Sequence, residues 1–251
     1  MRGYAKLRRA TLGALFVLVA TAGGVVAGPL EDGVAAFKSK DYATAQRLLR
    51  PLANQGNAEA QAKLGVMAYR AAVDAPTPQG YAEAVAWLRK AADHGSGEAM
   101  FWLHMAYEFG SGVPQDNAES LKWLRKAADD GNADAQDNLG EYYAAGHHVR
   151  QDNAEAARWY RKAADQGDSL AQYELGQMYV DGEGVPQDYV QARMWFNLAA
   201  SEIKIAAKFR DDLASKMTPA QIAEAQKMAR EWKPKLETPA GWWQWALSFF
   251  R

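Results

Sequence analysis

The chain has no cysteine among its 251 residues, and it lacks an excess of charge of either sign. Without cysteine, disulfide bonds, thiolate metal sites and lipid attachment through a thiol are excluded. The Rossmann and P-loop glycine patterns are also missing, which argues against a nucleotide site of either kind. A chain of this length suits one elongated domain or two compact ones.

The first 27 residues differ from the rest in composition. Four basic residues, Arg2, Lys6, Arg8 and Arg9, precede an uncharged run over residues 10–27. This order is typical of a secretory signal peptide cleaved after residue 27, so we expect a periplasmic or secreted protein. The alternative is an N-terminal anchor in the inner membrane, since about 18 apolar or small residues just span a bilayer. Cleavage leaves 25 basic and 30 acidic residues, a charge of −5, and we expect no nucleic-acid partner.

A tryptophan recurs every 36 residues within similar segments, WLRKAADHG, WLRKAADDG, WYRKAADQG and the degenerate WFNLAASE. The four are Trp87, Trp123, Trp159 and Trp195, and we expect them to belong to the structural core of the repeat. Each unit contains two helix-length segments separated by a glycine that suits a helix end. One helix pair cannot bury its apolar face alone, so the units are expected to stack into an all-α solenoid.

The segment DGEGVPQD, at residues 181–188, resembles a ligand-binding loop until it is compared with GSGVPQD and GHHVRQD upstream. Its recurrence indicates a connection between helices. A glycine ends one helix, Pro186 prevents its continuation, and Asp188 caps the next helix. Glycines inside the second helix of the units, such as Gly140 and Gly176, suggest close contact between helices.

Taken together, the tryptophan, KAA, LG and GVPQD positions resemble the Sel1-like repeat family, over residues 30 to about 232. The resemblance implies a right-handed superhelical solenoid of antiparallel helix pairs that serves as a binding scaffold. We expect a solenoid over residues 28–232, with units near 41–79, 80–116, 117–152, 153–188 and 189–232. A proline-broken aromatic tail follows at residues 233–251.

The second unit departs most from the others, in the segment AMFWLHMAYEFG. Trp102, Met105 and Phe109 share one helix side, with Phe101 at its border, and their counterparts in other units are mostly polar. An exposed apolar patch often marks an interaction site, so these four residues are the candidate partner-binding site. Packing against the loop at residues 74–80, or against the chain's own tail, is the alternative.

Three histidines replace glycine or small residues of the repeat. His104 stands where other units have the helix-packing glycine, and we interpret it as structural, in a wider or rotated helix contact. His147 and His148 occupy a turn that elsewhere reads Gly-x-Gly. Two adjacent histidines bind a metal only with further ligands. None is evident in the sequence, so we expect a solvated loop variant, no metal and no cofactor.

Two further features are interpreted without a functional role. Arginine and lysine columns recur along the repeat, at Arg50, Arg89, Arg125 and Arg161 and at Lys90, Lys126 and Lys162. We interpret them as a solvated, structural face rather than a groove for acidic ligands. Ser201 and Lys204 match the Ser-x-x-Lys pattern of penicillin-interacting enzymes, but no Lys-Thr-Gly accompanies them.

The tail after residue 232 is crowded with aromatic side chains, namely Trp242, Trp243, Trp245, Phe249 and Phe250. It is too short to span a bilayer. We expect it to cap the open end of the solenoid, with docking at a membrane interface or onto the patch around Trp102 as alternatives.

The sequence thus predicts an exported protein-protein interaction scaffold of the cell envelope rather than an enzyme. It would bind a protein or peptide through the solenoid groove and the patch in the second unit. A membrane-peripheral scaffold held by the aromatic tail is the alternative. An enzyme acting on cell-wall material or β-lactams is the rival from another class, and it would need converging catalytic groups that the sequence does not display.

Overall fold

The computed structural model describes residues 28–235, and within them the chain forms twelve α-helices, one short 3₁₀ helix and no strand. The helices are α1 (Pro29–Lys38), α2 (Tyr42–Asn54), α3 (Ala58–Asp74), α4 (Pro78–Asp93), α5 (Gly97–Phe109), α6 (Asn117–Asp129), α7 (Ala133–Ala145), α8 (Asn153–Gln166), α9 (Ser169–Asp181), α10 (Tyr189–Ala199), α11 (Lys204–Asp212), the 3₁₀ helix η1 (Leu213–Lys216) and α12 (Pro219–Glu231). The expected all-α solenoid is confirmed. The predictions for residues 1–27 and for the aromatic tail lie outside the described residues.

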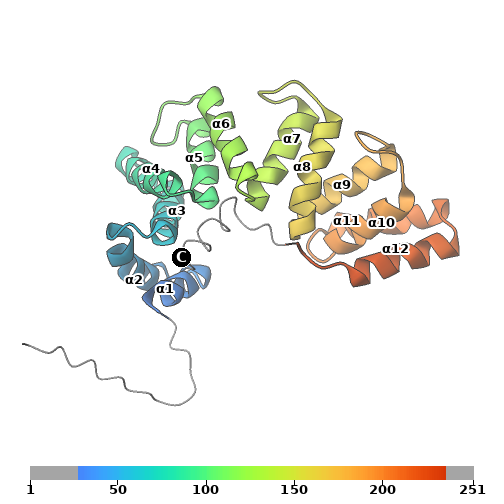
Figure 1. Ribbon diagram of the computed structural model, residues 1–251, viewed down its shortest axis with the longest axis horizontal. Helices are drawn as coiled ribbons and strands as arrows, with labels where there is room; N and C mark the ends of the chain where they lie inside the picture. Colours follow the sequence, from blue (N-terminus) through green and yellow to red (C-terminus); the bar gives the residue numbers. More distant parts are fainter. Residues whose placement is uncertain (1–27, 236–251) are drawn as a thin grey trace, which may run out of the picture.

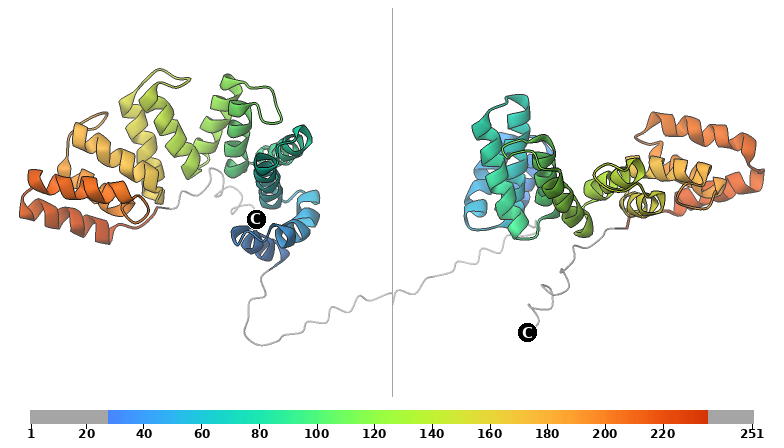
Figure 2. Two further views of the ribbon diagram at one scale, coloured as in Figure 1. Left: turned by 180° about the vertical axis from the view of Figure 1, so that it is seen from behind. Right: turned by 90° about the horizontal axis from the view of Figure 1, so that it is seen from above.

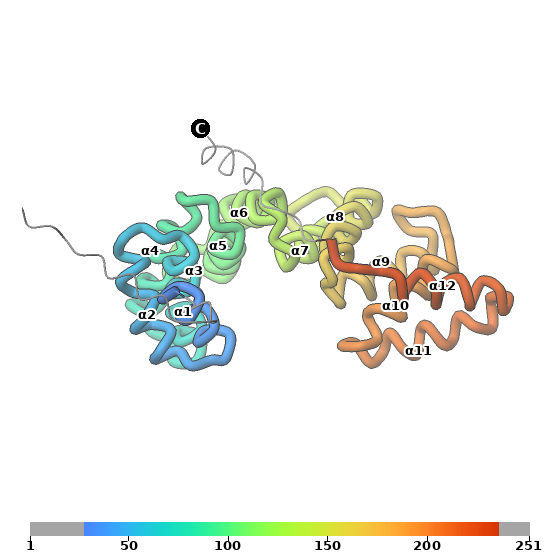
Figure 3. The backbone as a smooth tube through the Cα atoms, turned by 60° about the horizontal axis from the view of Figure 1, so that its bottom comes forward, coloured from blue at the N-terminus to red at the C-terminus, as the bar shows by residue number. Residues whose placement is uncertain are grey.

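Consecutive helices pack side by side along an arch, with α1 and α2 at one end and α10 to α12 at the other (Figure 1). The view from above shows that the molecule is elongated, with its first and last helices far apart (Figure 2). After α11, the last helix, α12, returns alongside α10 (Figure 3). Among residues 28–235, none of the helices combines the length and the apolar character that crossing a bilayer requires.

The buried column of the solenoid is formed by the residue that follows each repeated tryptophan. Its members are Leu88, Leu124, Tyr160 and Phe196. Of the tryptophans themselves only Trp195 is fully buried, whereas Trp87, Trp123 and Trp159 are half-buried. A lysine three positions later covers each half-buried ring, at 4.5, 4.6 and 4.0 Å from Nζ to the ring centroid. The lysine column therefore has a structural role in cation–π contacts on its own helix.

The glycines inside the second helices mark the closest helix contacts, as the sequence predicts. A Cβ atom on Gly65 would lie 2.7 Å from a side-chain atom of Leu88. The same distance separates a Cβ on Gly140 from Tyr160, and one on Gly176 from Phe196. A side chain at these positions would displace the buried column, so glycine is required by packing.

The GVPQD segments are connections between helices, which confirms their interpretation. Gly182 ends α9 in the left-handed conformation, with φ of 72°. The carboxylate of Asp188 accepts hydrogen bonds from the first turn of α10. The side chain of Gln187 donates to the carbonyl of Val180 at 2.7 Å, and Gln151 and Gln115 make the equivalent bond one and two units earlier. These bonds tie each loop to the end of the preceding helix.

Candidate functional site

The four residues of the expected partner-binding patch separate into different environments on α5. Trp102 is half-buried, with its ring 5.2 Å from that of Tyr69. Met105 packs at the edge of the N-terminal core, and Phe101 packs against the core of α6 and α7. Phe109 is 65% exposed. The segment thus combines internal packing with exposure, and Trp102 and Phe109 remain the two residues available to a partner.

Trp102 lines a groove of about 730 Å³ in the N-terminal half of the solenoid. Helices α2, α3 and α4 form its other walls, through residues that include Tyr42, Arg50, Met67, Arg70, Val73, Glu83 and Trp87. The lining is largely apolar, with two arginines at its surface. Thr77 also borders a second, shallower apolar hollow, between the loop at residues 75–78 and the loop at residues 110–114. The second loop follows Phe109 directly in the chain. The two hollows have Thr77 in common in their linings.

The charged groups of this groove are held by neighbouring side chains. The guanidinium of Arg50 lies 3.4 Å from the carboxylate of Glu83, and both are about half exposed. The guanidinium of Arg70 lies over the rings of Phe37 and Trp102, each at 5.6 Å. Stacking orients a guanidinium while leaving its edge free to meet a carboxylate. The groove therefore offers aromatic faces together with two arginines and two acidic residues, Asp74 and Glu83.

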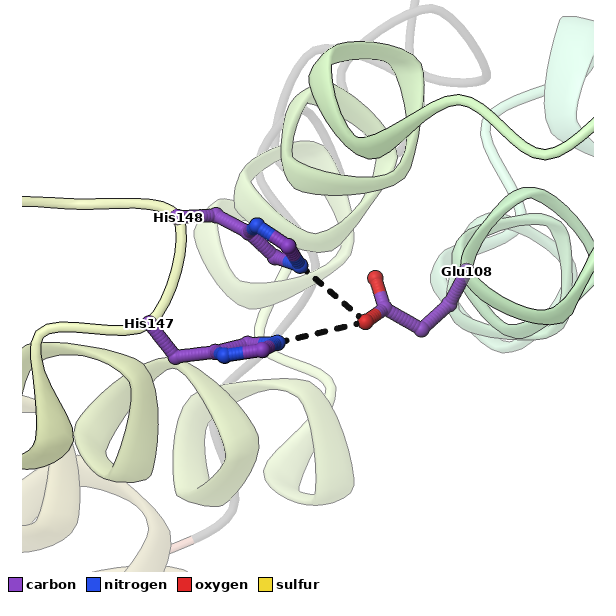
Figure 4. Close-up of side chains that lie close together, drawn as sticks. All are labelled: Glu108, His147 and His148. Carbon is purple, nitrogen blue, oxygen red and sulfur yellow. Dashed lines mark hydrogen bonds and ion pairs between the residues drawn. The ribbon is translucent and has the colours of Figure 1, made fainter.

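A second cluster lies where α5 meets the turn between α7 and α8. The Nε2 atoms of His147 and His148 lie 3.3 and 3.1 Å from the same oxygen, Oε1 of Glu108 (Figure 4). The other carboxylate oxygen of Glu108 accepts a hydrogen bond of 2.6 Å from the hydroxyl of Ser120. That hydroxyl also lies 2.8 Å from Nδ1 of the buried His104.

The electrostatics of this cluster follow from burial and hydrogen bonding. Desolvation alone would raise the pKa of Glu108, but hydrogen bonds from Ser120, His148 and His147 outweigh it and lower the pKa to about 2. Burial lowers the pKa of His104 to about 4, so its ring is neutral at physiological pH. Burial, the nearby charge of Glu108 and a hydrogen bond to it raise the pKa of Tyr142. A carboxylate anion is thus held among hydrogen-bond donors.

The structure corrects one premise of the sequence analysis. A further ligand does lie beside the adjacent histidines: it is Glu108, which is distant in the sequence and close in the fold. Comparison of the repeat units could have revealed this cluster. Other units have glycine where this chain has His104 and His148, alanine where it has Ser120, and apolar residues where it has Glu108. The residues that differ from the repeat pattern thus lie together in this cluster.

The serine and the arginines singled out in the sequence form hydrogen bonds with nearby residues. The hydroxyl of Ser201 donates to the carbonyl of Leu198 at 3.0 Å, at the end of α10. Arg89 and Arg161 donate to the hydroxyls of Tyr107 and Tyr179 on the neighbouring helix. The candidate tail residues Trp242, Trp243, Trp245, Phe249 and Phe250 lie outside the described residues, so the cap and the membrane contact stay predictions.

Comparison with protein families identifies five consecutive matches to the Sel1 repeat, at residues 30–57, 58–96, 97–132, 133–168 and 169–202. Among solved structures, a protective antigen of uropathogenic Escherichia coli strains with an SLR fold is 30% identical, with a TM-score of 0.63. The match covers 81% of this chain but only 46% of the antigen. A Sel1 repeat protein from Oxalobacter formigenes is 29% identical over 80% of this chain and 83% of its own, with a TM-score of 0.64. Comparison with curated proteins finds no significant match.

Proposed function

The chain belongs to the Sel1 repeat family, whose members are generally non-catalytic scaffolds for protein interaction, and we propose that it binds a peptide segment of a partner protein in its N-terminal groove. The observation that carries the proposal is the groove of about 730 Å³ that Trp102 shares with Trp87, Tyr42 and the two arginines. Apolar surface of this extent, with a few polar groups at its edge, is typical of a binding site.

The composition of the groove specifies the chemistry of the partner segment. Aromatic walls favour an apolar or aromatic anchor side chain, and tryptophan and arginine are the residues most often found at energetic centres of interfaces. The guanidinium of Arg70 favours an acidic residue next to that anchor, whereas that of Arg50 already faces Glu83. Phe109 is exposed and precedes Gly110 of the second hollow, so it would supply a second apolar contact to a segment that reaches that hollow. An extended peptide with apolar anchors and one acidic residue beside them fits these features.

Photo-crosslinking from inside the groove tests the proposal. A photoreactive amino acid in place of Val73, which is exposed and lines the groove, is expected to capture a small set of proteins in cells. Trp102→Asn introduces the residue of the third unit at this position and should reduce the captured amount by at least about tenfold. A purified partner segment should then bind the wild type more strongly than the variant.

A matched control removes an equally exposed apolar residue elsewhere. Leu170 in α9 is 58% exposed, and Leu170→Glu introduces the residue type of the first and second units. The control should keep the crosslink, and circular dichroism should show both variants folded. Equal capture by wild type and Trp102→Asn would contradict the proposal. A crosslink to the chain's own tail would show that the groove is occupied internally, which also contradicts partner binding.

We further propose that the protein acts in the cell envelope after export. The support is the basic and then apolar composition of residues 1–27, which precede the described structure. Mass spectrometry of the intact protein from a fractionated cell should find a mature chain that begins at Gly28, in the periplasm or medium. A chain that retains residues 1–27 in the inner-membrane fraction would support the anchor. Recovery of that full chain from the cytoplasm would contradict export.

The enzymatic interpretation has a direct test. It depends on Ser201 as nucleophile, and the hydroxyl of Ser201 is engaged with the carbonyl of Leu198. Catalysis would require a base and oxyanion donors next to this hydroxyl. We expect no turnover of cell-wall fragments or β-lactams by the purified protein. Turnover that disappears in Ser201→Ala would replace the scaffold proposal with an enzyme.

A further inference from the structure

Three side chains at the junction of α5 with the α7–α8 turn point their donor atoms at one place. They are Glu108, His147 and His148, and their nearest carboxylate oxygen and imidazole nitrogens all lie within 4.8 Å of one another (Figure 4). The two histidines approach from one side and the glutamate from the other. From this convergence we propose that the three residues bind a single Zn²⁺ ion.

The distances agree with a tetrahedral zinc site. Zinc lies about 2.0–2.1 Å from histidine nitrogens and at similar distances from carboxylate oxygens, so neighbouring donor atoms of a tetrahedron are about 3.3 Å apart. The two nitrogen–oxygen distances here are 3.3 and 3.1 Å. Two imidazoles and one carboxylate favour zinc over Mg²⁺ and Ca²⁺, which prefer oxygen ligands.

The backbone of the turn provides an independent observation. His148 has a φ of 57°, in the left-handed region that disfavours residues other than glycine. The equivalent turns have glycine there, because a Cβ on Gly112 would lie 2.6 Å from the backbone of Tyr81, and one on Gly184 would lie 2.0 Å from that of Asn153. Residues held in unfavourable backbone conformations cluster at functional sites. A histidine in this position needs a compensating interaction, which a bound ion supplies.

The surrounding residues support the ligands as an outer shell does. The hydroxyl of Ser120 donates to the carboxylate oxygen of Glu108 that faces away from the histidines, and so fixes the orientation of the carboxylate. His104 holds that hydroxyl from the other side. Outer partners of this kind orient the ligands of a metal site and tune its affinity. The sister units have glycine and alanine at the positions of His104 and Ser120.

The site would connect two repeats and stay open to solvent. Glu108 belongs to α5 and the histidines follow α7, so the ion would fix the relative orientation of these helices. The side chains of Glu108 and His148 are only 14% and 19% exposed, whereas that of His147 is 52% exposed. Three protein ligands leave the fourth position of a tetrahedral ion for water or for a donor atom of a bound protein.

The test uses the purified chain without a polyhistidine tag. Isothermal titration with Zn²⁺ should give one site per chain, and Co²⁺ should produce the visible absorption of a four-coordinate ion. The double variant His147→Ser, His148→Gly introduces the turn that the chain already has at residues 111–112, so it is expected to fold. It should bind zinc more than about tenfold more weakly. Glu108→Ala, which introduces the residue of the third unit, should do the same.

The control is another histidine of the chain. His94 lies beside Gln61, away from the cluster, and His94→Gln introduces the residue of the fourth unit. This variant should keep the zinc affinity of the wild type. Zinc should also raise the melting temperature of the wild type and of His94→Gln, but not that of the double variant. Equal zinc affinity in the wild type and the double variant, or no binding by either, would show a hydrogen-bonded cluster only and overturn the proposal.

Discussion

The imidazole Nδ1 of His104 lies 2.8 Å from the hydroxyl of Ser120, inside the contact between α5 and α6. Both side chains are fully buried. At the equivalent contacts the pairs are Gly65 with Ala84, Gly140 with Ala156 and Gly176 with Ala192. A buried imidazole needs a hydrogen-bond partner, and a buried hydroxyl needs one as well. The two departures from the repeat therefore compensate each other.

A double-mutant cycle tests this compensation. His104→Gly should lower the free energy of unfolding by about 3 kcal/mol, because it leaves a cavity, removes the hydrogen bond with Ser120 and places a glycine inside a helix. Ser120→Ala should lower it by about 1–2 kcal/mol. The double variant restores the glycine–alanine pair, so its loss should be smaller than the sum by about 1 kcal/mol. Urea unfolding of the four proteins measures the coupling, and additivity within about 0.3 kcal/mol would contradict the interpretation.

Most of the fold is predictable from the sequence, because the repeat shows each structural role several times. A glycine that recurs inside a helix, as Gly65, Gly140 and Gly176 do, indicates a contact too close for a side chain. Recurrent aspartates before helices indicate caps, and the structure shows hydrogen bonds to the carboxylates of Asp116 and Asp188. The half-burial of the tryptophans was not predictable. The apolar face of a tryptophan ring can be covered by a neighbouring helix or by the stem of a lysine on the same helix, and the repeat pattern is the same in both cases.

The candidate sites were harder to predict, because they depend on contacts between units. Glu108 meets His148 across 40 positions of sequence, and no local period relates these two residues. The contact arises from the stacking of α5 against the turn after α7. Trp102 shows the same limitation. The sequence places it on a surface of its helix, but only the packing of α3 shows that Tyr69 and Arg70 cover part of its ring.

Two glycine substitutions should separate backbone strain from steric conflict. Gly184→Ala would place a Cβ 2.0 Å from the carbonyl oxygen of Asn153, in a residue with φ of 70°. We expect a loss of about 3 kcal/mol or more in the free energy of unfolding. Gly56 has a comparable φ of 92°, but nothing lies within 4 Å of the added Cβ. Gly56→Ala should therefore cost only about 1 kcal/mol, from backbone strain. Equal losses by chemical denaturation would refute the assigned role of Gly184.

Truncation of the aromatic tail should decide between the cap and the membrane contact. The described chain ends with Lys235, whose backbone and side chain both bind Asp165 at the end of α8, at 2.7 and 2.9 Å. A stop after residue 239 keeps this attachment. If residues 240–251 cap the solenoid, as we expect, the shortened chain should lose several degrees of melting temperature. Unchanged melting together with lost binding to anionic vesicles would instead establish the membrane role.

Asp137 should make the protein less stable as the pH rises toward neutrality. Burial, and then the negative charges of Asp168, Glu141, Glu174 and Asp134, raise the pKa of its carboxyl from 3.8 to about 7. Its Oδ1 is buried, with no hydrogen-bond partner among the described residues. Between these two pKa values the unfolded chain has released the proton that the folded chain retains. The free energy of unfolding should therefore fall as the pH rises from about 4 to 7.

Asp137→Asn removes this titration and keeps the shape of the side chain. The variant should be more stable than the wild type at pH 7.5 by roughly 1–3 kcal/mol, and the two should converge near pH 4. Burial also raises the pKa of Asp134 and Glu174, so a shallower slope of the same sign should persist in the variant. Asp129→Asn, at an exposed position of α6, serves as the control and should follow the wild type. Urea unfolding gives the free energy of unfolding of both proteins at each pH. If this free energy changes with pH equally in the wild type and in Asp137→Asn, Asp137 is already ionised in the folded protein. Only a carboxyl that stays protonated on folding can make the two pH dependences differ.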